Sequence, residues 1–349
     1  MPSIRPLALI LLALAAPVVA GDTVRSVAVP GGSVRSVAVP GGSVRSVAVP
    51  GDGGWDYASV DATARRLYIA HGDAVSVVDL TSGRPLAPIG PAAHAHAVVP
   101  LPTGEIAVTN GTDNSVRFFA VASGRQVASL TVGAKPDAAV IDPATGHLLA
   151  MDADAGSVAE IDVRAHRLVR TIPVAEGLEY AAVAGRMLFV NNEDRSEIDV
   201  VDLNRGAAVA PIAMPGCEAP TGLGLDAAHH RLIAACANGV ATIVDTAKRL
   251  LVGRVPIGRG PDAVIVDQAR GRAYIPAGKD GVLDILSLAN ARAVTHQASI
   301  RTEPSARTGA LDPQSGTVWL PAARLVPAGD GGKPRAVPGS FHVLAVHPG

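Results

Sequence analysis

The sequence predicts an all-β protein, a seven-bladed β-propeller of four-stranded antiparallel blades, and three observations lead to this prediction. One pattern repeats seven times at intervals of 39 to 45 residues. Each repeat consists of short β-branched and apolar runs separated by Gly, Asn and Asp, with no longer helical period. The last repeat has only three strands, and an N-terminal segment resembles the fourth. Four strands every ~40–45 residues are typical of propeller blades.

Composition limits the functions open to this chain. Of its 349 residues, 48% are hydrophobic and 17% charged, whereas an average soluble chain is about 25% charged. The 30 basic and 31 acidic residues give a net charge of −1, so bulk charge does not attract a polyanion. Aromatic residues make up only 3%, which argues against a surface that stacks on bases.

Residues 1–20 have the pattern of an export signal. Arg5 supplies a positive charge, residues 7–16 form an apolar run, and Val18-Val19-Ala20 is a small-residue cleavage site before Gly21. The apolar run is shorter than the ~20 residues that a membrane-spanning helix needs. We therefore expect a periplasmic or secreted protein with no membrane span; a retained N-terminal anchor is the alternative.

The repeats are recognised by their strand sequences. RRLYIAHGDAVSVVDLTSGR at residues 65–84 returns as GEIAVTNGTDNSVRFFAVASGR at residues 104–125, and five further copies follow. The first apolar residues of the seven copies are Leu67, Ile106, Leu148, Leu188, Leu232, Ala273 and Val318. Strands A, B and C correspond to DAAVID, LLAM and VAEIDV in the third copy, and a D strand such as VASLTVG completes a unit. Seven copies predict seven blades.

The seventh blade is expected to be closed by the N-terminal part of the chain. Its A, B and C strands fall at residues 308–312, 318–322 and 341–346, and no D strand follows before Gly349. The segment SVRSVAVPGD leads into WDYASVD as other D strands lead into the next A strand. Closure by both termini would remove open sheet edges. Of three copies of this decapeptide between Thr23 and Asp52, the third, residues 43–51, lies at the right distance.

Residues 43–349 are thus predicted to form one propeller domain, preceded by a surplus decapeptide arm at residues 21–42. Duplication that leaves a mobile or loosely paired arm is one interpretation of the first two copies. An added edge strand, or an arm that binds a partner by strand addition, is another. The period of ten would also let a different copy close the ring.

The recurring YIA…VSVVDLTSGR…PDA pattern resembles the YVTN-type repeat of YncE-like exported bacterial proteins. CEAPTGLGLDAAHHRLIAAC, RTGALDPQSGTVWLPAAR and VPGSFHVLAV resemble one exported branch of that family, and the match runs from residue 43 to the C-terminus. The resemblance implies a propeller but no single activity. Some relatives have been linked to single-stranded DNA, and the wider fold includes lactonases and haem or quinone electron-transfer partners. This chain departs from the family in its triplicated arm, and it has no CxxCH haem attachment motif.

One position can be followed around the ring at the start of strand A. It holds Asp56, His96, Asp137, Glu179, Thr221, Asp262 and Arg307. Because A strands line a propeller's axis, these side chains should meet at one mouth of the central channel. The predicted ligand-binding residues are Asp56, His96, Asp137, Glu179, Asp262 and Arg307. Alternatively, Asp137 and Asp262, which follow prolines, only fix turns by accepting backbone N–H bonds.

The ends of the B strands form a second ring. It comprises His71, Asn110, Asp152, Asn192, Cys236, Ala277 and Ala322. Oxygen atoms of four residues could hold a hard divalent cation, which could activate water in a lactonase-like hydrolase. The predicted metal ligands are Glu179, Asn192, Asp152 and Asp137. The alternative is a set of solvated loop groups.

The two cysteines flank the first hairpin of the fifth blade. Cys217 lies in the loop before strand A and Cys236 ends strand B, so the hairpin brings both to one face. In an exported protein a disulfide is the expected state. Two buried thiols or a redox pair are the alternatives.

The sequence contains no familiar catalytic motif: nucleophile patterns, phosphate loops and dinucleotide fingerprints are missing. We expect a monomeric, non-enzymatic binding or scaffold protein that uses the channel mouth for a small ligand or a protein partner. A metal-dependent, lactonase-like hydrolase with a divalent cation as cofactor is the second hypothesis. Single-stranded nucleic-acid binding is the third, and it rests on the resemblance alone.

Overall fold

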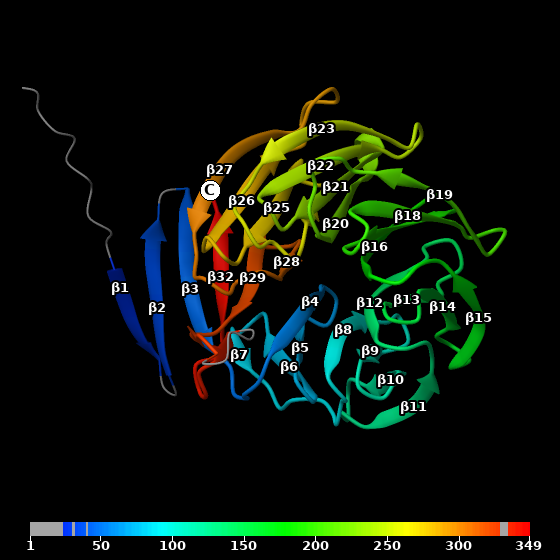
Figure 1. Ribbon diagram of the computed structural model, residues 1–349. Coiled ribbons are helices and arrows are strands. Elements are labelled where there is room, and N and C mark those ends of the chain that lie inside the picture. Colours follow the sequence, from blue (N-terminus) through cyan, green and yellow to red (C-terminus); the bar gives the residue numbers. More distant parts are fainter. Residues whose placement is uncertain (1–23, 30–31, 40, 329–333) are drawn as a thin grey trace, which may run out of the picture.

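The computed structural model describes residues 24–29, 32–39, 41–328 and 334–349. These residues form seven antiparallel blades in a ring, which confirms the predicted seven-bladed propeller (Figure 1). The predicted export signal lies outside the described residues. In the part described, the one helical element is a 3₁₀ turn at Ala227–His229, and no helix there is long and apolar enough to span a membrane.

Each blade runs outward from the centre of the ring. Blade one contains β4 (Trp55–Asp61), β5 (Arg66–His71), β6 (Ala74–Asp79) and β7 (Arg84–Pro85). Blade two contains β8 (Ala95–Pro100), β9 (Glu105–Asn110), β10 (Ser115–Ala120) and β11 (Gln126–Thr131). Blade three contains β12 (Pro136–Ile141), β13 (Leu148–Asp152), β14 (Ser157–Asp162) and β15 (Arg167–Pro173). Blade four contains β16 (Leu178–Ala184), β17 (Met187–Asn192), β18 (Glu197–Asp202) and β19 (Ala207–Ala213).

The remaining blades follow the same order. Blade five contains β20 (Pro220–Asp226), β21 (Arg231–Cys236), β22 (Val240–Asp245) and β23 (Leu250–Pro256). Blade six contains β24 (Ile265–Asp267), β25 (Arg272–Ala277), β26 (Val282–Ser287) and β27 (Thr295–Arg301). Blade seven contains β28 (Ala310–Asp312), β29 (Thr317–Ala322), β32 (His342–Pro348) and β3 (Gly42–Ala48), followed outward by β2 (Gly32–Val39) and β1 (Val24–Val29).

Aspartates at strand ends fix many of the turns. The Asp61 carboxylate accepts hydrogen bonds from the backbone N–H groups of Thr63 and Ala64, 2.9 and 2.8 Å away. An aspartate has the same role in other A–B turns, at Asp142, Asp267 and Asp312, and in C–D turns, at Asp79, Asp162, Asp202 and Asp245. These local hydrogen bonds explain why Asp recurs at the turns of the repeats.

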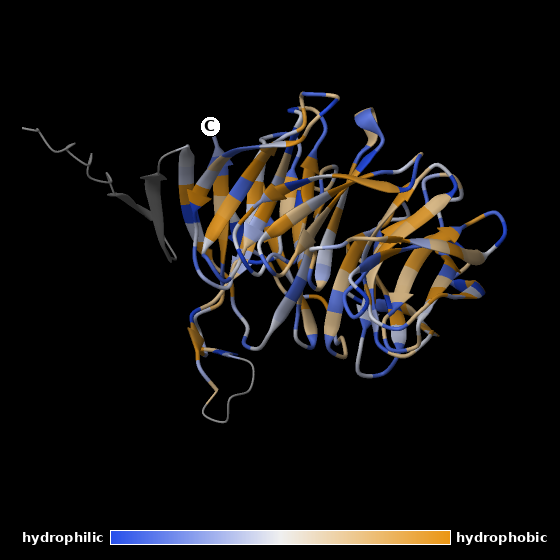
Figure 2. Cartoon of the chain, turned by 45° about the horizontal axis from the view of Figure 1, so that its top comes forward, coloured by the Kyte–Doolittle hydropathy of each residue, from blue (hydrophilic) through white to orange (hydrophobic). Residues whose placement is uncertain are grey.

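The B strands are almost wholly apolar because both faces of each blade are buried. In β5, Leu67 and Ile69 pack in one hydrophobic cluster with Trp319 of blade seven. Tyr68, on the opposite face, packs in another cluster with Phe119 of blade two. The hydrophobic cores therefore lie between blades, and alternating side chains of one strand join two neighbours. Figure 2 shows apolar residues concentrated along the strands.

The N-terminal strand β3 closes the ring, as predicted. It pairs antiparallel with β32 from Gly42↔Pro348 to Ala48↔His342. Val47 and Val49 are buried against the blade one–blade seven core, and the Arg45 guanidinium lies 5.8 Å from the centre of the Trp319 ring. Figure 1 shows this contact as blue β3 beside red β32.

The first two decapeptide copies extend the closing blade. β2 pairs with β3, and β1 pairs with β2, both antiparallel. Blade seven thus contains a six-stranded sheet, whereas the other blades have four strands. A short hairpin, β30 (Leu325–Val326) and β31 (Arg335–Ala336), projects from the same blade, and Figure 2 shows it standing away from the ring.

Candidate functional site

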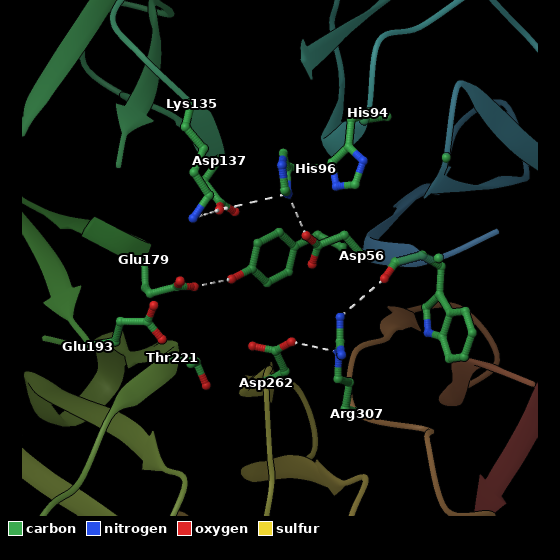
Figure 3. Close-up of a pocket in the computed structure, with 15 residues that line it drawn as sticks. Asp56, His94, His96, Lys135, Asp137, Glu179, Glu193, Thr221, Asp262 and Arg307 are labelled. Carbon is green, nitrogen blue, oxygen red and sulfur yellow. Dashed lines mark hydrogen bonds and ion pairs between the residues drawn. The ribbon is translucent and has the colours of Figure 1, made fainter. Parts of the chain in front are cut away.

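A cavity of about 490 Å³ lies at one mouth of the central channel. Its lining includes all seven residues of the predicted first ring: Asp56, His96, Asp137, Glu179, Thr221, Asp262 and Arg307. Figure 3 shows these side chains converging from separate blades. The structure therefore brings together the six predicted ligand-binding residues, and it adds Lys135, Glu193 and His94 to the wall.

A β-bulge places most ring residues where they point into the channel. In blade one, Trp55 pairs with His71 and Ala58 with Ile69, so β4 has one residue more than β5 across this stretch. The same irregularity occurs at the start of β8, β12, β16 and β20. Bulges re-aim side chains locally, and the ring residue of each of these strands lies inside the bulge.

Two side chains, those of His96 and Arg307, order part of the cavity through ion pairs. His96 Nδ1 lies 2.7 Å from Asp56 Oδ2 and 3.8 Å from Asp137 Oδ2. Arg307 Nε lies 2.8 Å from Asp262 Oδ2, and its guanidinium also donates to the Trp55 carbonyl at 3.3 Å. Burial alone would lower the pKa of His96, but the hydrogen bond that its ring donates to Asp56 and the charges of Asp137 and Asp56 outweigh it and raise the pKa.

The Asp137 carboxylate has charged neighbours but no hydrogen-bond donor at bonding distance among the described residues. His96 Nδ1 and Lys135 Nζ are both 3.8 Å away, although the Asp137 side chain is only 7% exposed. Neither Asp137 nor Asp262 accepts a bond from a described backbone N–H, so the turn-fixing alternative does not account for them. Burial, reinforced by Asp56, raises the pKa of Asp137 to about 7. Burial also raises the pKa of Asp262 to about 6, against the opposing charge of Arg307.

Glu179 accepts a hydrogen bond from across the channel, and its surroundings favour the protonated carboxyl group. The Tyr57 hydroxyl donates a 3.0 Å hydrogen bond to Glu179 Oε2, joining blade one to blade four. Burial, together with the charges of Asp137 and Asp262, raises the pKa of Glu179 to about 10. The tyrosine hydroxyl and the carboxyl group therefore share a neutral hydrogen bond in a region of negative potential.

Tyr57 also separates the mouth cavity from a second cavity within the channel. Its ring lies 4.9 Å from that of Tyr180, centre to centre. Tyr57 lines both the mouth cavity and an adjacent one of about 250 Å³, whose walls include Ala97, Val98 and Ile141. One end of the channel is consequently polar and the other mainly apolar.

The second predicted ring has a structural use. Asn110 accepts a hydrogen bond from the backbone of Ala93, and Asn192 donates one to the carbonyl of Glu176, so each ties its own blade's D–A loop. The Asp152 carboxylate bonds Ser157 Oγ at 3.1 Å and packs against the position of Gly133, in the loop before β12.

The four predicted metal ligands are therefore not gathered at one point. Only Asp137 and Glu179 line the mouth cavity. Asn192 is fully buried and also bonds Asp199 at 2.8 Å, and Asp152 is fully buried within its own blade. The repeat alignment predicts their oxygens at this mouth, whereas in the structure these side chains contact the loops before β12 and β16.

In blade five a disulfide occupies the equivalent position. Cys217 and Cys236 are bonded, with their Cα atoms 5.4 Å apart, which confirms the predicted pairing. The bond joins the D–A loop to the end of β21, as the amide of Asn192 does in blade four. The disulfide thus connects the D–A loop to strand B covalently, whereas blades two and four make this connection with hydrogen bonds.

Tyr57, Lys135 and Glu193 line the cavity but were not predicted to do so, and a finer alignment of the repeats points to Tyr57. The position after each ring residue is small in five repeats: Ala97, Ala138, Gly222, Ala263 and Thr308. In the other two repeats it is Tyr57 and Tyr180, whose rings contact each other inside the channel. Lys135 and Glu193 lie in loops, and only the tertiary structure brings them to the cavity.

Comparisons with known proteins agree on the fold. No protein-family model matches the chain, and no curated protein matches it. A chain of Kuenenia stuttgartiensis hydrazine synthase is similar in structure, with a TM-score of 0.66 and 16% identity, over 78% of this chain and 92% of that one. The RRP9 WD40 repeats give a TM-score of 0.71 and 10% identity, over 87% of this chain and 97% of that one.

A third similar structure is a chain of the mitotic checkpoint complex. Its TM-score is 0.67 at 15% identity, and the match covers 84% of this chain and 89% of that one. With identities this low, the likenesses concern architecture alone. They show that the chain has the WD40-like, seven-bladed propeller fold.

Proposed function

We propose that this protein is an exported binding propeller whose mouth cavity holds a positively charged group, either of a small ligand or of a protein partner. The observation that carries the proposal is the balance of charge in the cavity. Besides Glu179, whose protonated form is favoured, four carboxyl groups line it, those of Asp56, Asp137, Glu193 and Asp262, against the cations of Lys135 and Arg307 and the imidazole of His96. A concave site with excess carboxylates concentrates cations.

Other observations support the remaining parts of the proposal. The Cys217–Cys236 disulfide is consistent with an oxidising compartment outside the cytoplasm, as is the YncE-like sequence pattern. Propellers commonly serve as rigid scaffolds, and one structural neighbour belongs to a protein complex. The projecting hairpin β30–β31, with Leu325 and Val326 exposed, offers such a partner an additional contact.

Matched probes of opposite charge test the proposal. In chelator, agmatine should raise the melting temperature of the mature protein and bind by calorimetry, with affinity falling as salt increases. Glutarate, of similar length and opposite charge, should do neither. The double substitution Asp137→Asn with Glu193→Gln should weaken agmatine binding, whereas Glu218→Gln, on an exposed loop residue outside the cavity, should not. Equal binding of glutarate would contradict the proposal.

The hydrolase and nucleic-acid alternatives make different demands on the cavity. Hydrolysis of the lactonase type requires a metal ion to activate water. Binding of single strands requires a cationic path along the phosphate backbone, and the mouth cavity carries more carboxyl groups than fixed cations. We expect no salt-dependent binding of an oligonucleotide at this face; such binding, if found, would favour the third hypothesis.

A further inference from the structure

Three donor atoms from neighbouring blades meet in the mouth cavity. Asp56 of blade one, His96 of blade two and Asp137 of blade three each offer one ligand atom, and these atoms lie within 4.8 Å of one another. A zinc ion bonded at about 2.0–2.2 Å would hold its ligands roughly 3.4 Å apart. Small side-chain movements would therefore bring the three atoms around one ion.

The imidazole of His96 is already oriented toward this point. Its Nδ1 faces Asp56 and Asp137, and its Nε2 edge lies over Gly111. A Cβ at Gly111 would lie 2.5 Å from Nε2, so the ring occupies this place only because residue 111 has no side chain. The His94 ring packs beside it, 4.9 Å away centre to centre. Packing thus holds one ring nitrogen toward the cavity.

Asp137 gives a second, separate indication of a missing ligand. Its carboxylate is nine-tenths buried and lines the cavity, yet the nearest cationic nitrogens in the described chain are 3.8 Å away. Both nitrogens form ion pairs with it, but neither is close enough to hydrogen-bond, and a buried carboxylate without a hydrogen-bond donor is costly. A metal ion between Asp137 and His96 would supply the missing interaction.

The donor types restrict the choice of ion. Imidazole nitrogen favours first-row transition metals, and carboxylate oxygen is compatible with them. Calcium and magnesium prefer sites made of oxygen alone. With three protein ligands, the remaining coordination position would face the cavity, where water or a ligand can enter.

We propose that Asp56, His96 and Asp137 form a binding site for a first-row transition-metal dication such as Zn²⁺. The site deepens the proposed function, because it rests on the mouth cavity being the ligand site. Lys135 competes with the ion for Asp137. Its ammonium group lies 3.8 Å from Asp137 Oδ2, and its side chain is 37% exposed, so it has room to move away when the ion binds.

Metal binding to the mature, disulfide-bonded protein tests this site. Zn²⁺ should raise the melting temperature relative to chelator, and Co²⁺ should develop the visible absorption of a cobalt ion bound to nitrogen and oxygen. His96→Gln and Asp137→Asn should each weaken Zn²⁺ binding at least about tenfold. Lys135→Gln should strengthen it, because the competing charge is removed. The exposed-loop variant Glu218→Gln should leave it unchanged, and melting curves in chelator confirm that each variant is folded.

Any of four results would overturn the site. Zn²⁺ shifts of equal size in wild type and in His96→Gln would show adventitious binding elsewhere. Stabilisation by Ca²⁺ that survives His96→Gln but is lost in Glu179→Gln would place the cation at the carboxylates that the sequence predicts as ligands. If agmatine binds in chelator while no metal does, the metal site fails and the proposed function stands. If neither binds, both fail.

Discussion

At the residue scale, Glu179 shows how the ring changes the chemistry of its members. Its side chain is one carboxyl group among five in the cavity, yet it is the one buried against Tyr57. Desolvation and neighbouring charges favour its protonated form, so its pKa rises from 4.5 to about 10. A carboxyl group of this kind binds its proton more tightly in the folded state than in the unfolded chain.

Substituting Glu179 by Gln should therefore stabilise the protein at alkaline pH and change its stability little at acidic pH. The stabilising contribution of the protonated carboxyl is fully present below the unfolded pKa of 4.5 and is lost as the pH rises toward about 10. Glutamine keeps the oxygen that accepts the Tyr57 bond but cannot ionise. At pH 8.5 we expect Glu179→Gln to be more stable than wild type by on the order of 2 kcal/mol.

Thermal melts across pH 4.5 to 9 measure this difference. The gap between the variant and wild type should close as the pH falls. Glu218→Gln, on an exposed loop residue, should follow wild type throughout. A constant gap at every pH would show that the carboxyl group does not titrate in the expected range.

At the element scale, the blades differ in the bond that connects the D–A loop to the end of strand B. Asn110 and Asn192 use single hydrogen bonds, and Cys217–Cys236 uses a covalent bond. The disulfide closes a short loop, with a sequence separation of 19 residues. Such a crosslink stabilises mainly by restricting the unfolded chain.

Replacing Cys217 and Cys236 by Ala should lower the free energy of unfolding by about 3 kcal/mol. Denaturant titration of the double variant, against wild type with and without reductant, measures the loss. The variant should not respond to reductant, and unreduced wild type should not be alkylated. Two alkylated thiols in unreduced protein would contradict the disulfide.

At the scale of the whole molecule, ring closure depends on a contact between the two ends of the sequence. β3, near the N-terminus, pairs with β32, near the C-terminus. Val47 and Val49, at the end of β3 and just after it, are buried in the core between blades one and seven. β1 and β2 lie outside this contact, on the far side of β3. The ring therefore requires one copy of the decapeptide.

Two truncations separate the closing strand from the extra strands. Removal of residues up to 40 deletes β1 and β2 but keeps Gly41, whose carbonyl accepts the 2.7 Å hydrogen bond from Gly349. This chain should melt at nearly the wild-type temperature. Removal through Gly51 also deletes β3, and the loss of its ladder and its two buried valines should lower the melting temperature by about 10 °C or more. Equal melting of both truncations would refute closure by β3.

Features that recur in every repeat can be predicted from the sequence alone. Spacing and strand chemistry predicted seven blades, the closing strand β3, the cysteine pair and the seven residues around the channel mouth. These features follow from backbone periodicity: residues at equivalent positions in equivalent blades reach equivalent places in space. The choice of the third decapeptide copy has the same local origin, because only that copy leads directly into β4.

The interactions among the channel-mouth residues, in contrast, depend on the folded arrangement of the blades. It paired His96 with Asp56 and Arg307 with Asp262, and it left Asp137 without a close donor among the described residues. It also turned Asp152 and Asn192 toward loops and placed Tyr57 across the channel. Charge pairing, burial and pKa depend on distances of a few ångströms between blades that are far apart in sequence, and periodicity along the chain does not specify those distances.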